Sequence, residues 1–374
     1  MSGPRHLYVH LPFCSSRCGY CDFVTAVGRP DEHATYVEAL LEELELERDL
    51  LARELETVFL GGGTPTFTEP GALERLLDSL PPAAELTVEA NPETVTPELA
   101  ALLRRAGVNR VSLGAQSFQP ELLAVLDRVA QPDTIRRAFY HLRDAGFGNI
   151  SLDLIYGIPG QSPSDLEADL GEALTLGPEH LSCYELEAKP GTRFTHAHGA
   201  ELARQAEAME SYFELVVDRL TDAGYRWYET ANFCRVPEAV GGRDLRARHN
   251  LAYWLGRDYL GVGVGAVSTI ENRRWRNTPR LRAYLDALSR RQRPERELEV
   301  LSDAVRREER VMLGLRLDEP LVLGPVAAAV DDVALERMES LGLASVSRLA
   351  GPATISLTRR GRLLGGGVTA EILA

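Results

Sequence analysis

The first half of the chain alternates short apolar segments with amphipathic ones, and this alternation restricts the fold more than any other feature of the sequence. Six short runs rich in apolar and β-prone residues are predicted as strands: 7–11, 57–60, 86–89, 110–113, 150–155 and 180–184. Five longer segments with helical spacing of apolar residues lie between them: 31–56, 72–80, 97–106, 133–145 and 164–176. Strands that alternate with helices pair in parallel through right-handed crossovers. The sequence therefore predicts an α/β fold built on a parallel sheet.

The residues at the strand ends distinguish an open doubly wound sheet from an incomplete barrel. Each predicted strand ends in chemically unusual residues: the cysteines at 14–21, the glycines at 61–63, Glu89, Gln116, Asp153 and Tyr184. Barrel-type α/β proteins gather their functional side chains at the C-terminal ends of the strands. We therefore expect a partial (β/α)6 barrel with its site at that face.

Three of the five cysteines, Cys14, Cys18 and Cys21, lie close together after the first predicted strand. Three neighbouring thiols form a poor disulfide set because one is left over, but thiolates are good ligands for zinc or an iron–sulfur cluster. No fourth cysteine follows, since position 23 is Phe23. Three protein ligands leave one coordination position open, which indicates that an external group binds or reacts there.

The strand–helix alternation loosens beyond the sixth predicted strand. A helix is predicted at 208–223, a strand at 225–232 and an exposed loop at 235–248, which has few apolar residues and a glycine pair. We therefore assign residues 1–232 to the partial barrel and residues 233–300 to a connecting segment.

The C-terminal residues, 301–374, are predicted to form a small α+β module. Helices are expected at 301–317 and 326–343, followed by a strand at 355–358 and a further helix. This order resembles a winged helix, but no continuous basic face accompanies it. We therefore expect a structural or docking module rather than one that binds nucleic acid.

The charge of the chain excludes several classes of function. Its 374 residues carry 41 Lys and Arg against 55 Asp and Glu, a net charge of -14, which argues against general affinity for nucleic acid or anionic membranes. No apolar run reaches the roughly 18 residues of a membrane span, and the polar N-terminus does not resemble a signal peptide. Cysteines grouped as ligands fit a reducing cytoplasm, and Cys183 and Cys234 are interpreted as small buried apolar residues.

The cysteine spacing and the glycine motif together resemble those of the radical SAM superfamily. The spacing is Cys14-x-x-x-Cys18-x-x-Cys21 after the first strand, and the second strand runs into the Gly-Gly-Gly-Thr-Pro motif at 61–65. Four segments are similar to one branch of that superfamily, at 8–14, 88–92, 112–118 and 153–160. This branch holds the oxygen-independent coproporphyrinogen III oxidases and their heme-chaperone relatives of HemW type, and the resemblance runs from about residue 6 to the C-terminus.

The resemblance implies two cofactors and the residues that hold them. A [4Fe–4S] cluster would be ligated by Cys14, Cys18 and Cys21, and S-adenosylmethionine would chelate its fourth iron. An electron from the cluster would then cleave the sulfonium of S-adenosylmethionine to give a 5′-deoxyadenosyl radical. The positions that match the S-adenosylmethionine contacts of the family are Tyr8, Gly62, Gly63, Thr64, Glu89, Gln116, Arg128 and Asp153. Glu89 and Asp153 on buried strands also need charged partners on physical grounds alone.

Two features favour the chaperone branch over the oxidase. As the family is described, the oxidases carry a further cysteine where Phe23 stands. The segment from His249 through Asn250 to Tyr253 and Trp254 matches the HNxxYW heme-binding signature of the chaperones. His249 would then be an axial heme ligand, and the two aromatic residues would wall the porphyrin.

Several features leave alternatives open. The basic residues of 273–276 are interpreted either as contacts for heme propionates or as a solvated turn. His196 or His198 is an alternative heme ligand. Ala130 and Val267 stand where related sequences often carry histidines, which weakens the expectation that the chain is a fully competent enzyme.

We therefore predict a cytoplasmic heme chaperone of porphyrin metabolism, with a [4Fe–4S] cluster, S-adenosylmethionine and heme. It would deliver heme to proteins such as membrane-bound cytochromes, visiting the membrane surface transiently. The alternative is an oxygen-independent coproporphyrinogen III oxidase that decarboxylates propionates to vinyl groups, and zinc at the cysteines is the weakest reading. The sequence leaves open the electron donor, homodimer formation and whether S-adenosylmethionine is cleaved.

Overall fold

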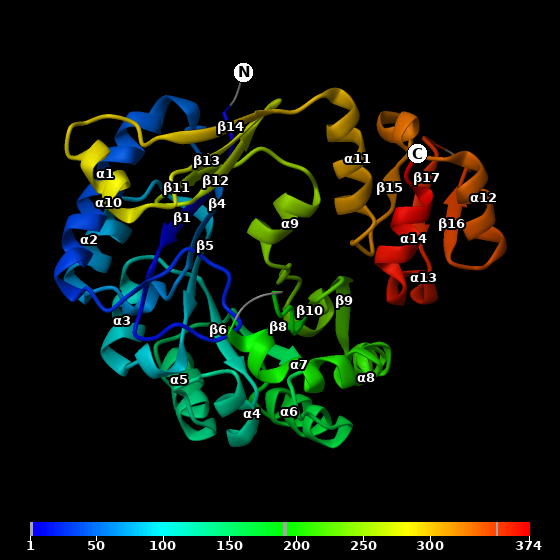
Figure 1. Ribbon diagram of the computed structural model, residues 1–374, viewed down its shortest axis with the longest axis horizontal. Coiled ribbons are helices and arrows are strands. Elements are labelled where there is room, and N and C mark those ends of the chain that lie inside the picture. Colours follow the sequence, from blue (N-terminus) through cyan, green and yellow to red (C-terminus); the bar gives the residue numbers. More distant parts are fainter. Residues whose placement is uncertain (1–2, 190–192, 349–350) are drawn as a thin grey trace.

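The computed structural model describes residues 3–189, 193–348 and 351–374, and a nine-stranded sheet forms its centre (Figure 1). The strands follow in the spatial order β11 (Leu260–Val262), β1 (His6–Leu11), β4 (Leu55–Gly62), β5 (Ala83–Ala90), β6 (Arg110–Gln116), β7 (Ile150–Tyr156), β8 (His180–Glu185), β10 (Asn232–Arg235) and β9 (Tyr225–Glu229). From β11 to β8 every neighbouring pair is parallel, and β10 is antiparallel to both β8 and β9. The six predicted strands and their parallel pairing are confirmed.

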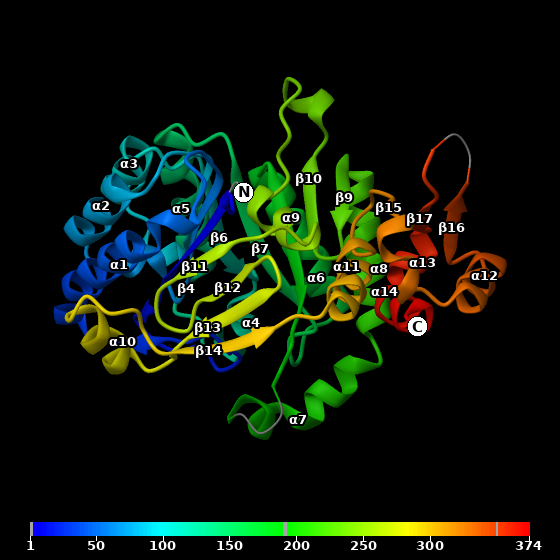
Figure 2. The same cartoon turned by 90° about the horizontal axis from the view of Figure 1, so that it is seen from above.

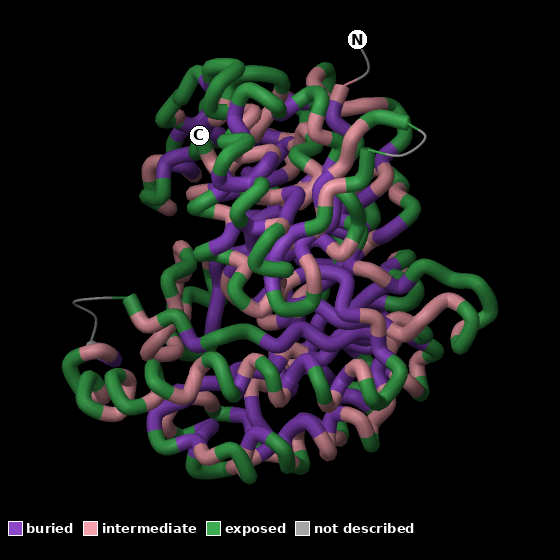
Figure 3. The backbone as a smooth tube through the Cα atoms, turned by 90° about the vertical axis from the view of Figure 1, so that its right-hand side faces the viewer, coloured by how far each residue is buried: buried purple, intermediate pink, exposed green. Residues whose placement is uncertain are grey.

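Helices cover the outer face of this sheet, as Figure 1 shows from α1 to α6. Their bounds are α1 (His33–Glu47), α2 (Pro70–Ser79), α3 (Pro97–Arg105), α4 (Pro120–Val125), α5 (Pro132–Asp144) and α6 (Pro163–Leu176). Proline at the first helical position sets the start of all but α1, because proline has no N–H to leave unpaired there. Ser162 and Asp165 add a capping box to α6. The strands of the sheet are buried in the interior, and Figure 3 shows this backbone surrounded by exposed helices and loops.

The structure differs from the sequence-based expectation at two local boundaries. The helix predicted at 31–56 ends at Glu47, and Leu55 instead begins strand β4, because its side chain is buried in the sheet. The single strand predicted at 225–232 is wrong: β9 and β10 form a hairpin that adds two strands to the edge of the sheet.

The segment predicted to connect the barrel to the C-terminal module is largely ordered into elements. It holds α9 (Arg248–Trp254), α10 (Leu281–Leu288), the edge strand β11 and a separate three-stranded antiparallel sheet. The strands of that sheet are β12 (Val267–Ile270), β13 (Arg273–Asn277) and β14 (Arg296–Val300). Within the range predicted as an exposed loop, a short 3-10 helix spans Pro237–Val240.

The C-terminal elements pack around an apolar cluster of their own, to the right of the central sheet in Figure 1. They are α11 (Asp303–Gly314), β15 (Leu321–Val322), α12 (Asp332–Ser340), β16 (Ala344–Ser347), β17 (Thr354–Leu357), α13 (Arg359–Leu363) and α14 (Gly365–Ile372). The three strands form an antiparallel sheet in the order β15-β17-β16.

Two helices between β8 and β9, α7 (Arg193–Ala206) and α8 (Met209–Asp222), complete the fold, and α7 projects from the body of the molecule in Figure 2. None of the helices in the described ranges combines the length and the apolar character needed to cross a membrane.

Candidate functional site

The cysteine loop is anchored at both ends beside the C-terminal end of β1. Cys14 ends the short strand β2 (Phe13–Cys14), which pairs in parallel with β3 (Ala26–Val27) where the loop returns. The N–H of Gly28 donates to the carbonyl oxygen of Cys14 at 3.3 Å. The loop that carries Cys18 and Cys21 therefore closes on itself directly above the sheet.

All five cysteines are free thiols, and they fall into two groups by environment. Cys183 and Cys234 are buried in the apolar interior, which confirms their interpretation as small core residues. Cys18 and Cys21 are half-buried, and burial raises the pKa of the Cys14 and Cys21 thiols. Among the residues that the structure describes, no group of three His, Cys, Asp or Glu side chains is arranged to hold a metal ion.

A chain of hydrogen bonds nevertheless ties two of these thiols to the strand ends. Arg128 donates through Nη1 to Cys18 Sγ at 3.7 Å and through Nη2 to Asn91 Oδ1 at 2.9 Å. Asn91 Nδ2 donates to Thr64 Oγ1 at 2.9 Å, and Thr64 Oγ1 donates to Cys14 Sγ at 3.5 Å. A guanidinium beside Cys18 and a hydroxyl on Cys14 stabilise thiolates, the form in which sulfur ligates iron. The donor set thus fits an iron–sulfur cluster.

The glycines at the C-terminal end of β4 leave space that no other residue would leave. Gly62 has a φ of 113°, and a Cβ there would lie 2.5 Å from the ring of His10. A Cβ on Gly63 would lie 2.6 Å from the backbone of Pro12. The N–H of Gly62 donates to Glu89 Oε2 at 3.1 Å. The backbone at 61–63 therefore forms a narrow surface between the cysteine loop and Glu89, which we call the shelf.

Two carboxylates face this shelf from β5 and β7. Asp153 accepts hydrogen bonds from Ser112 Oγ at 3.1 Å and from Ser151 Oγ at 3.3 Å. Burial, followed by the nearby charge of Asp153, raises the pKa of Glu89 to about 7, although the N–H of Gly62 and the buried guanidinium of Arg110 oppose the rise. A carboxyl group poised near neutrality accepts either a cationic amine or a proton from a ligand.

Arg128 and Gln116 both lie close to Gly114, near the end of β6. Arg128 Nη2 also donates to the carbonyl oxygen of Gly114 at 2.9 Å, while its buried Nε has no partner among the described residues. Gln116 ends β6 at a register shift and has a φ of 67°, which turns the chain out of the sheet. The two carboxylates, together with a guanidinium that keeps a free donor, suit a zwitterionic ligand such as an amino acid derivative.

Tyr8, on β1, connects to both Gly62 and the cysteine loop through His10, whose ring lies next to Gly62. Its hydroxyl lies 3.0 Å from His10 Nδ1, and His10 Nε2 lies 2.9 Å from the carbonyl oxygen of Val24 in the cysteine loop. Its ring stacks on Phe59, with a centroid distance of 6.2 Å. The structure therefore brings together the eight positions expected to contact S-adenosylmethionine.

Sequence reasoning missed four side chains of the site: His10, Asn91, Arg110 and Ser112. Each lies inside or beside a segment quoted for the resemblance, so the segment carried the signal while the individual residue did not. Arg110 is only 2% exposed and its place between two carboxylates depends on strand pairing.

His249 occupies a position that differs from the expectation of a heme ligand. It lies on α9 with 1% exposure and packs against Phe59 at a centroid distance of 5.2 Å. Its Nδ1 lies 2.7 Å from Thr57 Oγ1, and its Nε2 lies 2.8 Å from the hydroxyl of Tyr253. Burial, with a smaller contribution from His6, lowers the pKa of His249 to about 3. Because both ring nitrogens are hydrogen-bonded, His249 offers no free nitrogen to heme iron in this conformation.

The other residues of the signature and its neighbours fall into distinct environments. Asn250 and Trp254 are half-buried on α9, and the guanidinium of Arg316 lies 4.4 Å from the centre of the Trp254 ring. Arg274 is bound by both carboxylate oxygens of Glu309, each at 2.8 Å. Arg274 is thus neutralised rather than free for a propionate.

The alternative histidines lie elsewhere, on α7. His196 is exposed, and His198 is half-buried against Phe194 with a centroid distance of 4.8 Å. Phe23, at the position that favours the chaperone branch, is 63% exposed in the cysteine loop.

Comparison with known proteins identifies the family. Residues 8–173 match the radical SAM superfamily. The chain is 38% identical to the heme chaperone HemW of Mycobacterium tuberculosis, over 99% of this chain and 95% of that protein. It is 34% identical to the heme chaperone HemW of Bacillus subtilis, over 83% of each.

Among solved structures, the coproporphyrinogen III oxidase (HemN) of Escherichia coli, a radical SAM enzyme, shares the fold. The TM-score is 0.81 at 24% identity, covering 99% of this chain and 90% of that one. This likeness confirms the expected partial barrel of radical SAM type. Together with the two relatives, it shows that the chain belongs to the HemW-type heme chaperone family of the radical SAM superfamily.

Proposed function

We propose that this protein holds a [4Fe–4S] cluster and S-adenosylmethionine in the barrel, binds heme beside α9 and hands it to heme proteins. The observation that carries the proposal is the packing of the signature helix against the strands of the cofactor site. Tyr8 of β1 and Phe59 of β4 both contact the ring of His249. The residues expected to hold cofactors and those expected to hold heme therefore form one continuous packed unit.

The chain's own residues supply the functions that the cofactors require. Cys14, Cys18 and Cys21 would ligate the cluster, with Arg128 and Thr64 stabilising thiolate charge. When bound, such a cluster supplies one-electron chemistry and one iron with an open coordination position.

S-adenosylmethionine would bind beside the shelf. Glu89 and the backbone around Gly62 and Gly63 would hold its amine, and Arg128 would neutralise its carboxylate. Gln116 and Asp153 would contact the ribose, and Tyr8 would lie near the adenine.

For heme, we propose a revised division of roles within the signature. Asn250, Tyr253 and Trp254 would contact the porphyrin, while His249 acts as a positioning residue that orients Tyr253 through the 2.8 Å hydrogen bond. The acceptors would be heme proteins such as membrane-bound cytochromes, reached from the cytoplasm during transient contact with the membrane surface. We also propose that residues 301–374 form a separate winged-helix-like docking module, supported by their own apolar cluster.

Coproporphyrinogen III oxidation remains the competing function, because the oxidase of Escherichia coli shares the fold. The purified full chain, reconstituted anaerobically with iron and sulfide, is tested in parallel for hemin binding and, with S-adenosylmethionine and a one-electron reductant supplied, for conversion of coproporphyrinogen III. We expect saturable hemin binding and no turnover. Sustained formation of protoporphyrinogen IX, or no binding of hemin, contradicts the proposal.

A further inference from the structure

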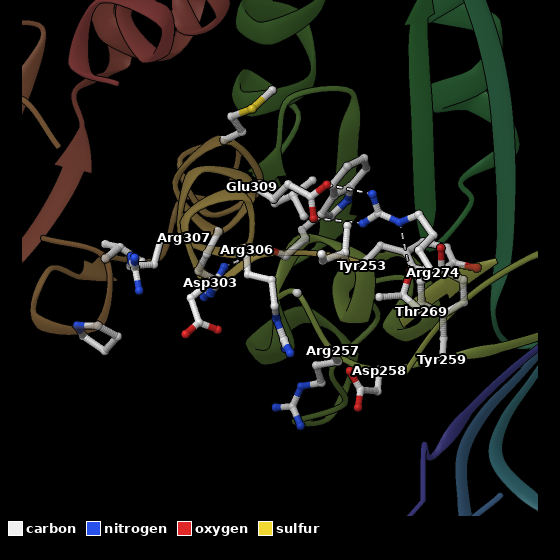
Figure 4. A pocket seen from close by; sticks show the side chains of 18 residues that line it. Tyr253, Arg257, Asp258, Tyr259, Thr269, Arg274, Asp303, Arg306, Arg307 and Glu309 are labelled. Atoms are coloured by element: carbon white, nitrogen blue, oxygen red, sulfur yellow. Dashed lines mark hydrogen bonds and ion pairs between the residues drawn. The ribbon is translucent and has the colours of Figure 1, made fainter. Parts of the chain in front are cut away.

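A cavity of about 770 Å³ lies between α9 and α11, outside the barrel site (Figure 4). Its walls come from the C-terminal end of α9, from β12 and β13, and from α11 with the turn before α12. Tyr253 and Trp254 of the signature line it, whereas His249 does not. This volume lies in the upper range of small-molecule and cofactor sites.

The cavity concentrates positive charge in a chain whose net charge is -14. Arg257, Arg306 and Arg307 line it, and none of the three has an ion pair or side-chain hydrogen bond to another residue in the described ranges. The Nε of Arg307 is buried without a partner. Arg310 donates to the carbonyl oxygen of Trp254 at 2.9 Å. Burial, with the neighbouring charge of Arg257, lowers the pKa of Arg310, as expected for a buried guanidinium beside another positive charge.

The carboxylates around the cavity offset only part of this charge. Glu309 is engaged by Arg274 through two hydrogen bonds of 2.8 Å. Asp258 accepts the N–H of Glu271 at 2.9 Å, and Asp303 lies exposed in the first turn of α11. Five arginines against three carboxylates leave a local excess of two positive charges.

The remaining wall is apolar and partly aromatic. Tyr253 and Trp254 line the cavity from α9, Met312 and Leu313 line it from α11, and Val326 lines it from the 3-10 helix Gly324–Ala329. Trp254 Nε1 is buried with no hydrogen-bond partner among the described residues. A ligand that matches this site has a large apolar body and more than one carboxylate at its edge.

We propose that this cavity binds the dicarboxylate edge of a porphyrin macrocycle, with Arg257, Arg306 and Arg307 receiving the propionates and the α9 aromatics contacting the ring. This inference rests on the proposed function. It adds the cavity in which the porphyrin binds and the arginines that form ion pairs with its carboxylates. Because no cavity-lining residue is a histidine, recognition through the carboxylates operates without iron ligation by His249.

The test compares hemin with its dimethyl ester, which lacks the two carboxylates. The reconstituted full chain and the double variant Arg306→Ala/Arg307→Ala are titrated with each ligand by absorbance. Arg282→Ala is the matched control, because Arg282 is exposed on α10 and does not line the cavity. Thermal unfolding of each variant verifies that the fold is unchanged, as expected when the removed arginines have no partner.

We expect the double variant to bind hemin at least about tenfold more weakly, because it loses charge-assisted hydrogen bonds to carboxylates. The ester should bind the wild type and the double variant alike, and Arg282→Ala should bind hemin as the wild type does. Equal hemin affinity of wild type and double variant overturns the cavity assignment while heme binding stands. A wild type that binds no hemin overturns the proposed function itself, and with it the cavity.

Discussion

Substituting alanine for His249 removes a side chain that is buried and hydrogen-bonded through both ring nitrogens. Truncating a buried ring costs about 3–5 kcal/mol where the site cannot collapse, and the stack on Phe59 is lost with it. The Tyr253 hydroxyl loses its partner, whereas Thr57 keeps a hydrogen bond of 2.9 Å to His6. We therefore expect the free energy of unfolding to fall by about 3–5 kcal/mol.

The pH dependence of this loss carries a definite sign. The pKa of His249 falls from 6.5 to about 3 on folding, so the unfolded chain binds more protons between these values and the wild type loses stability as the pH falls. The alanine variant lacks this term. The difference between the two proteins should be largest above pH 6.5 and shrink below it, by at most about 1.4 kcal/mol per pH unit.

Denaturant unfolding of apo wild type, His249→Ala and His249→Gln at pH 7.5 and pH 5 measures both effects. The glutamine variant keeps a polar group that reaches Tyr253, so it should recover part of the stability. A loss below about 1 kcal/mol for His249→Ala, together with a large fall in hemin affinity, refutes this reasoning and restores His249 as an exposed iron ligand.

Three further outcomes follow from the barrel site. Cys14→Ser should abolish the cluster after reconstitution, measured as bound iron and sulfide, whereas Cys183→Ala, a buried cysteine outside the loop, should retain it; equal iron content contradicts the ligand assignment. Gly62→Ala should prevent binding of S-adenosylmethionine in equilibrium dialysis, because the added Cβ would lie 2.5 Å from the His10 ring at a residue with positive φ. The control Gly171→Ala adds a Cβ in open space on α6, and this variant should bind S-adenosylmethionine normally. The pKa of Glu89 rises from 4.5 to about 7 on folding, so the folded chain keeps this proton between those pH values and the free energy of unfolding of the apo protein should fall as the pH rises from 4.5 to 7. Glu89→Gln should remove this fall, which amounts to at most about 3 kcal/mol over the interval. An unchanged pH dependence in the variant excludes the pKa shift.

The parts of the fold that could be predicted from the sequence are those determined by local patterns. The strand runs are recognisable because the parallel strands β1, β4, β5, β6, β7 and β8 contribute mostly buried residues to the core, and parallel pairing places their ends at one edge. Glu89 and Asp153 were therefore expected in one site before their strand pairing was known. The cysteine loop was equally visible, since all its thiols come from one segment.

The rest depends on contacts between segments that lie far apart in the chain. The turn between β9 and β10 contains Thr230 and Ala231, without the glycine or asparagine that signals a hairpin. The Thr57 contact that occupies His249 joins residues 192 positions apart. The cavity likewise forms only when α9 and α11 come together, so single arginines in the sequence gave no indication of it.

The central claim is that the chain carries heme for transfer rather than transforming a porphyrin. The most direct measurement loads the reconstituted full chain with hemin, removes free hemin and adds an apo heme protein, following transfer by the change in Soret absorbance. We expect transfer to the apo protein with the porphyrin chemically unchanged. Hemin that stays on the chain with no transfer contradicts it.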